Sequence, residues 1–313
     1  MWANHGHAVQ LFGKNPSRIE ELRDRRENVP HLRGITLPPE IRLTNDLRDC
    51  GEANLIVFVM RSTALRETVA SLKKVSIQSD AVLLSCIKGI EHGTGKRMSE
   101  IIRETFSQHT IAVLSGPNLA AEVSRDLPTA TVLACTKQDE VVELQSVLGT
   151  PRFRVYTSND LVGVELGGAL KNVFAIAAGA GDGLRLGDNS KAALVTRALA
   201  EMVRLGTKMG GELRTFYGLS GAGDLIATCF SQHSRNRRTG EQLAKGRSLE
   251  EIASLTGTVA EGIPTAKSAY ECARALGVET PITEQVYSIL YGGKSPAEAM
   301  EELLKREQKA ETL

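Results

Sequence analysis

The residue pattern of this chain changes near residue 159, and that change limits the folds that the chain can adopt. Before it, short β-rich runs alternate with longer helix-type segments, which is typical of βα units on a parallel sheet. After it, the β signal ends and apolar residues recur at helical spacing. With 313 residues, the chain is long enough for two domains. We therefore predict an α/β domain over residues 1–158 and an all-helical domain over residues 159–313.

Six apolar runs are candidate strands of the first domain. They lie at residues 8–12, 54–60, 81–86, 110–114, 129–135 and 152–156. The run from Leu55 to Met60 is apolar on both faces, as a central parallel strand covered by helices on each side would be. The pattern predicts an open, doubly wound parallel sheet.

The second half is predicted to be helical. The Asn159-Asp160 pair can cap a long apolar helix that begins at Leu161. Another apolar stripe predicts a helix over residues 196–209, which the Gly210-Gly211 pair ends. Further helices are predicted over residues 249–255, 265–276, 281–291 and 296–306.

Composition favours a small-molecule partner. The 38 Lys and Arg residues balance 37 Asp and Glu residues, so the chain lacks the basic field that nucleic acid or an anionic membrane would require. The five cysteines are widely spaced, and His5-x-His7 lacks a third ligand, so neither a disulfide framework nor a metal site is expected. The apolar runs are short and the N-terminus has no signal-peptide features, so we expect a cytoplasmic protein without a membrane span.

A dinucleotide fold normally opens with a strand and G-x-G-x-x-G, whose backbone N–H groups approach the pyrophosphate. Neither Gly179–Gly183 nor Gly221–Asp224 completes this motif, and both lie in the helical half. We therefore expect that about 20 residues, one strand and one glycine turn, are missing upstream. Lys14 follows the first candidate strand. It could bind the 2′-phosphate of NADP, or it could be a solvated loop lysine.

Three segments of the second half carry groups suited to acid-base chemistry on a small anion. Lys171 lies on the long apolar helix, where an ammonium must pair with an acid or lose its proton. Asp224, in a glycine-rich segment, is a candidate partner for it. The run Ser234-Arg235-Asn236 offers a planar cation and two polar side chains to a phosphate. We assign a structural role to Arg237 and Arg238.

Six motifs resemble, in their order, those of the bacterial-type NAD(P)-dependent glycerol-3-phosphate dehydrogenases, and the resemblance covers essentially the whole chain. They are Cys86-Ile-Lys-Gly-Ile-Glu91, Ser115-Gly-Pro117, Gly167-Gly-Ala-Leu-Lys-Asn-Val173, Gly223-Asp-Leu225, Ser234-Arg-Asn-Arg-Arg238 and Val259-Ala-Glu-Gly262. The resemblance implies a Rossmann-like sheet domain followed by a 6-phosphogluconate-dehydrogenase-like helical domain. It also implies reversible hydride transfer between sn-glycerol 3-phosphate and NAD or NADP, giving dihydroxyacetone phosphate and supplying glycerol 3-phosphate for glycerophospholipid synthesis.

The resemblance also implies roles for individual residues. Lys171 would be the proton acceptor for the C2 hydroxyl. Asn118 stands where the family often has Ser and keeps the capacity to donate and accept hydrogen bonds. The residues implied at the substrate are Lys88, Gly116, Asn118, Lys171, Asp224, Ser234, Arg235 and Asn236. Those implied at the cofactor are Lys14, His31, Lys88, Ala120, Arg235, Val259 and Glu261, of which His31 aligns only loosely.

Two alternatives remain open from the sequence. A 3-hydroxyacid or 6-phosphogluconate type dehydrogenase would have an asparagine four residues after the lysine, but Ala175 stands there and Asn172 is adjacent. The second alternative is a truncated, cofactor-deficient chain that binds a phosphorylated small molecule without turnover. The helical half offers enough apolar surface for a homodimer.

Overall fold

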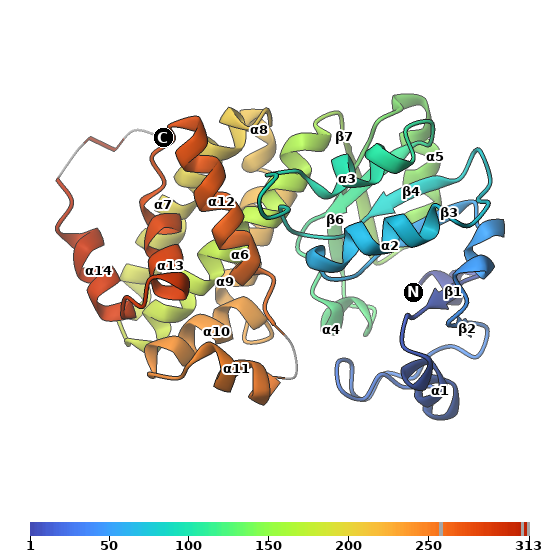
Figure 1. The fold of residues 1–313 in the computed structure, drawn as a ribbon, viewed down its shortest axis with the longest axis horizontal. Coiled ribbons are helices and arrows are strands. Elements are labelled where there is room, and N and C mark those ends of the chain that lie inside the picture. Colours follow the sequence, from blue (N-terminus) through green and yellow to red (C-terminus); the bar gives the residue numbers. More distant parts are fainter. Residues whose placement is uncertain (257–258, 308–309, 312–313) are drawn as a thin grey trace.

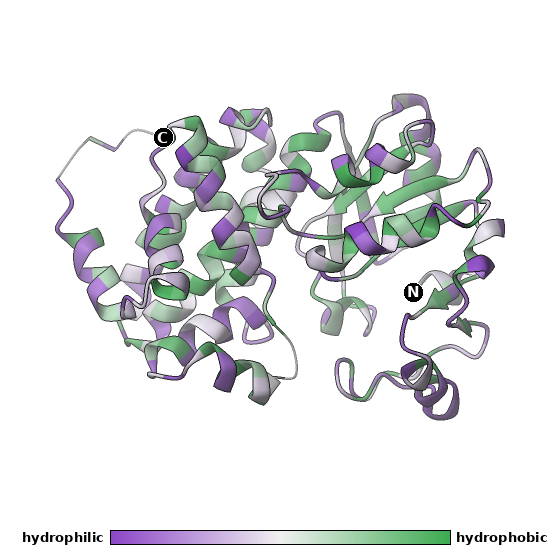
Figure 2. Cartoon of the chain, in the orientation of Figure 1, coloured by the Kyte–Doolittle hydropathy of each residue, from purple (hydrophilic) through white to green (hydrophobic). Residues whose placement is uncertain are grey.

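The computed structural model describes residues 1–256, 259–307 and 310–311. Two sheets occupy the N-terminal half, and a bundle of helices forms the C-terminal half beside them (Figure 1). Apolar residues concentrate in the strands and on the inward sides of the helices (Figure 2). The predicted order of a sheet region followed by a helical region is confirmed.

A small two-stranded sheet comes first in the chain. Its strands are β1 (Gln10–Phe12) and β2 (Arg42–Thr44), which pair in parallel. The helix α1 (Pro16–Arg25) lies between them in sequence and packs Ile19 and Leu22 against Leu43. The strand β2 was not predicted, because three residues with one charged side chain carry almost no strand signal.

The larger sheet has five strands in the order β3-β4-β5-β6-β7. They are β3 (Leu55–Phe58), β4 (Val82–Ser85), β5 (Ile111–Ser115), β6 (Thr129–Cys135) and β7 (Phe153–Ser158). Successive strand residues point to opposite faces. Leu83 therefore packs with α2 (Leu65–Leu72) and α3 (Met98–Thr105), whereas Leu84 packs with α5 (Gln138–Leu148) on the other side. All six predicted strands are present, but only five belong to this sheet, since the strand predicted at residues 8–12 is β1 of the small sheet. Helices cover both faces of the larger sheet.

Two expectations about this sheet are wrong in detail. First, β6 runs antiparallel to β5, so the sheet is mixed. A parallel return needs a long crossover connection, but the helix between these strands, α4 (Ala120–Val123), has only four residues. Second, β3 is an edge strand of this sheet rather than a central one. Three of its four residues are only partly buried, whereas Leu83, Leu84 and Ala112 of β4 and β5 are fully buried.

The helix α6 (Leu161–Gly183) is the centre of the C-terminal half. Asp160 caps it by accepting a hydrogen bond from the backbone of Gly163 at 2.8 Å, as the sequence predicted. A Cβ on Gly179 would lie 1.8 Å from the Arg237 carbonyl, and one on Gly240 would lie 1.9 Å from that of Ile176. These glycines therefore let α6 and α10 (Arg235–Ala244) approach backbone to backbone.

The remaining helices pack around α6. They are α7 (Gly187–Lys208), α8 (Leu213–Phe216), α9 (Asp224–Phe230), α11 (Leu249–Thr256), α12 (Gly262–Leu276), α13 (Pro281–Tyr291) and α14 (Pro296–Leu304), with the π-helical turn η4 (Leu219–Gly223) before α9. The predicted bounds of α13 are confirmed, whereas α7 begins nine residues before its predicted start. β7 ends at Ser158 and α6 begins at Leu161. The division into domains 1–158 and 159–313 stays a prediction.

Among the described residues, α6 is also long and apolar enough to cross a membrane. The core helix of a globular protein can have the same length and composition. An apolar 18-residue stretch of α6 is 83% buried inside this protein. We expected only apolar runs too short to span a membrane, but α6, with 23 residues, is long enough. Its burial nevertheless indicates a core helix.

Candidate active site

A buried ion pair joins α6 to α9. Lys171, in the middle of α6, is 5% exposed, and Asp224, the first residue of α9, is 1% exposed. The Lys171 ammonium donates hydrogen bonds to Asp224 Oδ1 and, at 2.7 Å, to Thr228 Oγ1. Thr228 lies one helical turn after Asp224, and its hydroxyl is 3.3 Å from Asp224 Oδ1. The predicted pairing of Lys171 with Asp224 is therefore present, and Thr228 completes it.

A second ammonium shares the same carboxylate. Lys88 follows β4, at the carboxyl end of the sheet. Its Nζ lies 2.6 Å from Asp224 Oδ2 and donates to the carbonyl oxygen of Gly116, after β5, at 2.8 Å. The Lys88 side chain is 20% exposed, compared with 7% for that of Lys171. One carboxylate thus holds a deeply buried lysine and a lysine that solvent reaches.

This arrangement depresses the pKa of Lys171 to about 7. Burial is the largest cause, because it penalises the charged form, and repulsion from the Lys88 ammonium is the next. Attraction to Asp224 acts in the opposite direction but does not cancel them. Lys171 can therefore gain or lose a proton near neutral pH.

Two asparagines connect the backbone of Lys88 to α10 and α12. Asn172 Nδ2 donates to the carbonyl oxygen of Lys88 at 3.3 Å, and its Oδ1 accepts from Asn236 Nδ2 at 2.8 Å. Asn236 Oδ1 in turn accepts from the backbone of Gly262 at 2.9 Å. Asn172 was not among the predicted site residues, although its position next to Lys171 is a usable signal.

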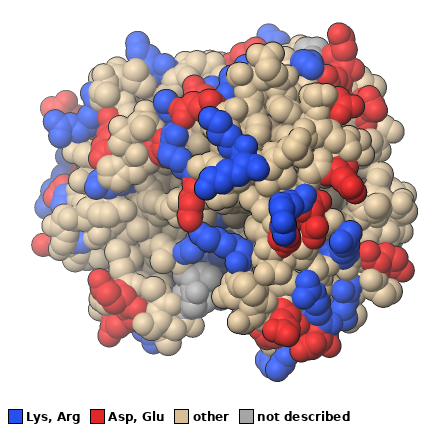
Figure 3. Space-filling view, turned by 45° about the vertical axis from the view of Figure 1, so that its right-hand side comes forward, with Lys and Arg blue, Asp and Glu red and all other residues tan. Residues whose placement is uncertain are grey.

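The N-terminus of α10 has the features that suit an anion. Ser234 is its N-cap, is 4% exposed, and accepts a hydrogen bond from the backbone of Arg237 at 3.2 Å. The first N–H groups of a helix lack intrahelical partners and attract anions. Arg235, the first residue of α10, is exposed. Figure 3 shows Lys and Arg side chains around a hollow near the middle of one face of the molecule.

The loop after β5 leaves one hydrogen-bond acceptor unused. A Cβ on Gly116 would lie 3.0 Å from Thr131 Cα, so the backbone packs closely there. Asn118 Nδ2 donates to Thr131 Oγ1 at 3.0 Å. In contrast, Asn118 Oδ1 is buried and has no hydrogen-bond partner in the described part of the chain. A buried acceptor of this kind can accept a hydrogen bond from a bound molecule.

The other predicted site residues lie in several places. Glu261 Oε2 accepts a hydrogen bond from Ser62 Oγ at 2.7 Å, which connects the start of α12 to the turn after β3. Ala120, at the start of α4, and Val259 are exposed. Lys14 is exposed and lies 2.5 Å from Glu67, and His31 is exposed between α1 and β2. The structure thus groups Lys88, Gly116, Lys171 and Asp224 through direct contacts, and Asn172 connects Asn236 to the Lys88 backbone. In contrast, Lys14 and His31 belong to the segment around α1 and the β1–β2 sheet.

The doubly wound sheet, the helical half and a buried lysine on α6 with a lowered pKa, close to Lys88 at the carboxyl edge of the sheet, are features of a dehydrogenase of the Rossmann class. Two family models match: the N-terminal part of NAD-dependent glycerol-3-phosphate dehydrogenase over residues 1–141 and the C-terminal part over residues 160–301. The chain belongs to the family of NAD(P)-dependent glycerol-3-phosphate dehydrogenases.

Individual relatives agree with this assignment. A glycerol-3-phosphate dehydrogenase [NAD(P)+] of Desulfitobacterium hafniense is 45% identical over 306 residues, which cover 98% of this chain and 87% of the relative. One from Chlorobium phaeobacteroides strain BS1 is 46% identical over 313 residues, 99% of this chain and 93% of the relative. The crystal structure of glycerol-3-phosphate dehydrogenase from Coxiella burnetii superposes with a TM-score of 0.94 at 36% identity, covering 97% of this chain and 94% of that one. None of these comparisons supports the non-catalytic alternative.

The residues at the carboxyl ends of β4 and β5 fit the nicotinamide end of NAD or NADP. The unpartnered Asn118 amide oxygen can accept a hydrogen bond from a carboxamide N–H, a group that the nicotinamide carries. Lys88 and the Gly116 backbone lie at the same edge of the sheet, where ligands bind in open α/β folds.

Proposed function

We propose that this chain catalyses reversible hydride transfer between sn-glycerol 3-phosphate and NAD(P)⁺, giving dihydroxyacetone phosphate. In the reductive direction it would supply glycerol 3-phosphate for glycerophospholipid synthesis. Family membership supports the reaction class. The observation that carries the proposal is the buried Lys171–Asp224 pair. The residue after Lys171, Asn172, is hydrogen-bonded to Asn236 at the N-terminus of α10.

Lys171 is the proposed proton acceptor in the oxidative direction. Its neutral amine takes the proton of the C2 hydroxyl, and in the reverse direction its ammonium returns that proton to the C2 oxygen. When bound, the nicotinamide accepts or supplies the hydride. Asp224 and Thr228 fix the direction of the Lys171 Nζ lone pair, because both are within hydrogen-bond reach of that atom. The pKa of about 7 lets the group work in both directions near neutral pH.

Lys88 has two proposed tasks. Its ammonium is the more exposed of the two that bind Asp224, so it can approach the substrate oxygen while Lys171 exchanges the proton. Negative charge develops on that oxygen during reaction, and a fixed cation stabilises it. The same charge lowers the pKa of Lys171, which keeps part of the amine neutral. Gly116 and Asn118 would line the substrate beside Lys88.

The phosphate would lie at the N-terminus of α10. Arg235 offers a planar, permanently charged fork, and Ser234 and Asn236 add polar groups to the free N–H groups of the helix. Asn236 is also bonded to Asn172, the residue after the proton acceptor. This hydrogen bond supports a fixed spacing between phosphate and C2.

The cofactor contacts are proposed at Lys88, Ala120, Arg235, Val259 and Glu261 near the site. Lys14 and His31 are proposed around the β1–β2 sheet. The Lys14–Glu67 ion pair is highly exposed, and such pairs contribute little stability, so a 2′-phosphate could displace it.

A cytoplasmic location and a homodimer are further proposals. The apolar residues Leu213, Ile226 and Phe230 are exposed on neighbouring helices of the C-terminal half and would suit an interface. Light scattering across a concentration series tests the dimer.

The reaction is tested by following NADPH and NADH oxidation with dihydroxyacetone phosphate. We expect turnover by the wild type that depends on both substrates. If the protein binds glycerol 3-phosphate but shows no turnover with either cofactor, the proposed function is contradicted.

A further inference from the structure

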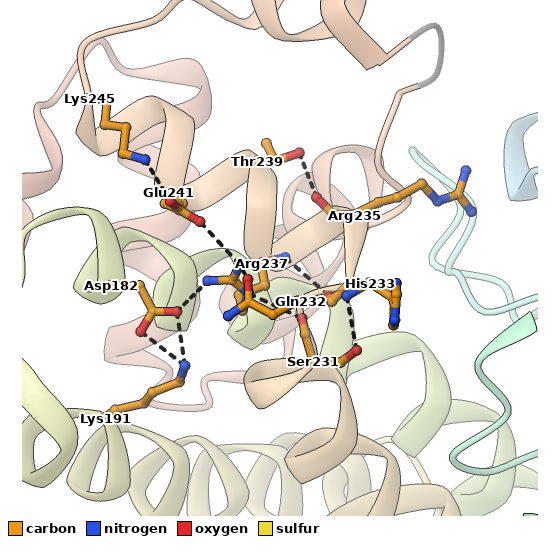
Figure 4. Close-up of polar contacts among 11 residues, drawn as sticks. Asp182, Lys191, Ser231, Gln232, His233, Arg235, Arg237, Thr239, Glu241 and Lys245 are labelled. Carbon is orange, nitrogen blue, oxygen red and sulfur yellow. Dashed lines mark hydrogen bonds and ion pairs between the residues drawn. The ribbon is translucent and has the colours of Figure 1, made fainter. Parts of the chain in front are cut away.

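A buried arginine lies beside the proposed phosphate site without facing it. Arg237 is the third residue of α10, and its side chain is 4% exposed. Residues two apart on a helix point to nearly opposite sides, so the guanidinium of Arg237 faces away from that of Arg235. Figure 4 shows the Arg235 side chain extending away from the cluster around Arg237.

The guanidinium of Arg237 holds the loop of residues 231–234, which joins α9 to α10. Its Nε donates to the carbonyl oxygen of Ser231 at 3.1 Å, and its Nη2 donates to Gln232 Oε1 at 2.8 Å. At the other end of the loop, the backbone N–H of Arg237 donates to Ser234 Oγ at 3.2 Å. One residue thus fixes both the end of α9 and the start of α10 (Figure 4).

Two carboxylates balance the buried charge. Nη1 lies 2.6 Å from Asp182 on α6, and Nη2 lies 3.1 Å from Glu241, one turn further along α10. Asp182 also binds Lys191 at 2.9 Å, and Glu241 binds Lys245 at 2.6 Å. A buried cation without such partners would be costly, and only a planar fork can reach two acids and two loop oxygens together.

We propose that Arg237 is a positioning residue for the substrate phosphate and acts through this loop and the N-terminal turn of α10. The inference rests on the proposed function, because that function places the phosphate at Ser234 and Arg235. Lys171 and Asp224 are held separately, by each other and by Thr228. Loss of the Arg237 fork therefore weakens phosphate binding while the proton-transfer groups keep their contacts.

The test compares Arg237→Ala and Arg237→Lys with Arg238→Ala, a matched control that removes the same charge from an exposed neighbour on the same helix. Calorimetric titration with glycerol 3-phosphate should show affinity about tenfold or more weaker in both Arg237 variants, and within about twofold of wild type in the control. The KM for dihydroxyacetone phosphate should rise by a similar factor, with kcat changing less than about twofold. With dihydroxyacetone, which lacks the phosphate, kcat/KM should stay near wild type.

Added methylguanidinium should restore affinity to Arg237→Ala and not change that of Arg238→Ala. Folding of each variant is checked by circular dichroism, and if Arg237→Ala does not fold, Arg237→Lys, which keeps a cation beside Asp182, decides the question. Wild-type affinity in a folded Arg237 variant would overturn the proposal, as would equal losses of kcat/KM for the two ketones. If the wild type binds glycerol 3-phosphate but does not turn it over, the proposed function is contradicted and the proposal for Arg237 is not. The comparison of affinities still reports on Arg237 in that case.

Discussion

The two ammoniums on Asp224 predict that Lys88 sets the pH range in which Lys171 works. Replacing Lys88 with methionine keeps a long, flexible side chain and removes its charge. Repulsion from Lys88 depresses the pKa of Lys171, so this change should raise that pKa above its value of about 7. The kcat/KM for glycerol 3-phosphate oxidation should then rise at a more alkaline pH, because the proton acceptor must be neutral.

Coulomb's law sets an upper limit on the size of the shift. Two unit charges 4 Å apart interact by about 4 kcal/mol at an effective dielectric constant of about 20, which corresponds to about three pKa units. The two ammoniums bind different oxygens of Asp224, and the Lys88 side chain is 20% exposed, so screening reduces the effect. We therefore expect the inflection of the pH profile to move to a more alkaline pH by about one pH unit in Lys88→Met.

The assay is a pH profile of kcat/KM for glycerol 3-phosphate from about pH 5.5 to 10, which reports the pKa of the free enzyme. Activity falls in Lys88→Met because the substrate contact is lost, but the inflection point does not depend on that amplitude. Lys88→Arg is the matched control, since it keeps a cation beside Asp224 and should keep the inflection near 7. An unchanged inflection in Lys88→Met would refute the reasoning.

Three further predictions test the site and the fold. Lys171→Ala should abolish dihydroxyacetone phosphate-dependent NADPH oxidation while cofactor affinity, measured by NADPH fluorescence, stays within about twofold; near wild-type turnover would exclude Lys171 as the proton acceptor. Arg235→Ala should raise the KM for dihydroxyacetone phosphate by about tenfold or more and change kcat/KM for dihydroxyacetone much less. Equal losses of kcat/KM for the two ketones would place the phosphate elsewhere. Glu201, 1% exposed, accepts hydrogen bonds from the backbones of Ile282 and Thr283 at 2.8 Å, so Glu201→Gln should lower the free energy of unfolding in urea by about 2 kcal/mol. Glu301→Gln, the same change at an exposed position, should lower the free energy of unfolding much less. A Glu201→Gln variant as stable as wild type would show that the Glu201 carboxylate does not stabilise the start of α13.

Much of the fold follows from local sequence pattern. All six predicted strands are present, and the long helix begins where Asp160 caps it, because apolar periodicity and capping are encoded within a few residues. The antiparallel direction of β6 was missed, because strand direction depends on the path of the connection and the pattern within a strand does not record it. The short β2 was missed because three residues give too little periodic signal.

The sequence alone determined which chemical groups are present: a lysine on an apolar helix, a carboxylate in a glycine-rich turn and a Ser-Arg-Asn run with anion-binding character. Only the tertiary structure decided that Lys88 and Lys171 share Asp224, that Thr228 joins them and that Arg237 faces inward. Lys88 and Asp224 are 136 residues apart, and no local pattern connects them. The proton affinity of Lys171 depends on burial and on these neighbouring charges, so it is a property of the folded chain and not of the motif.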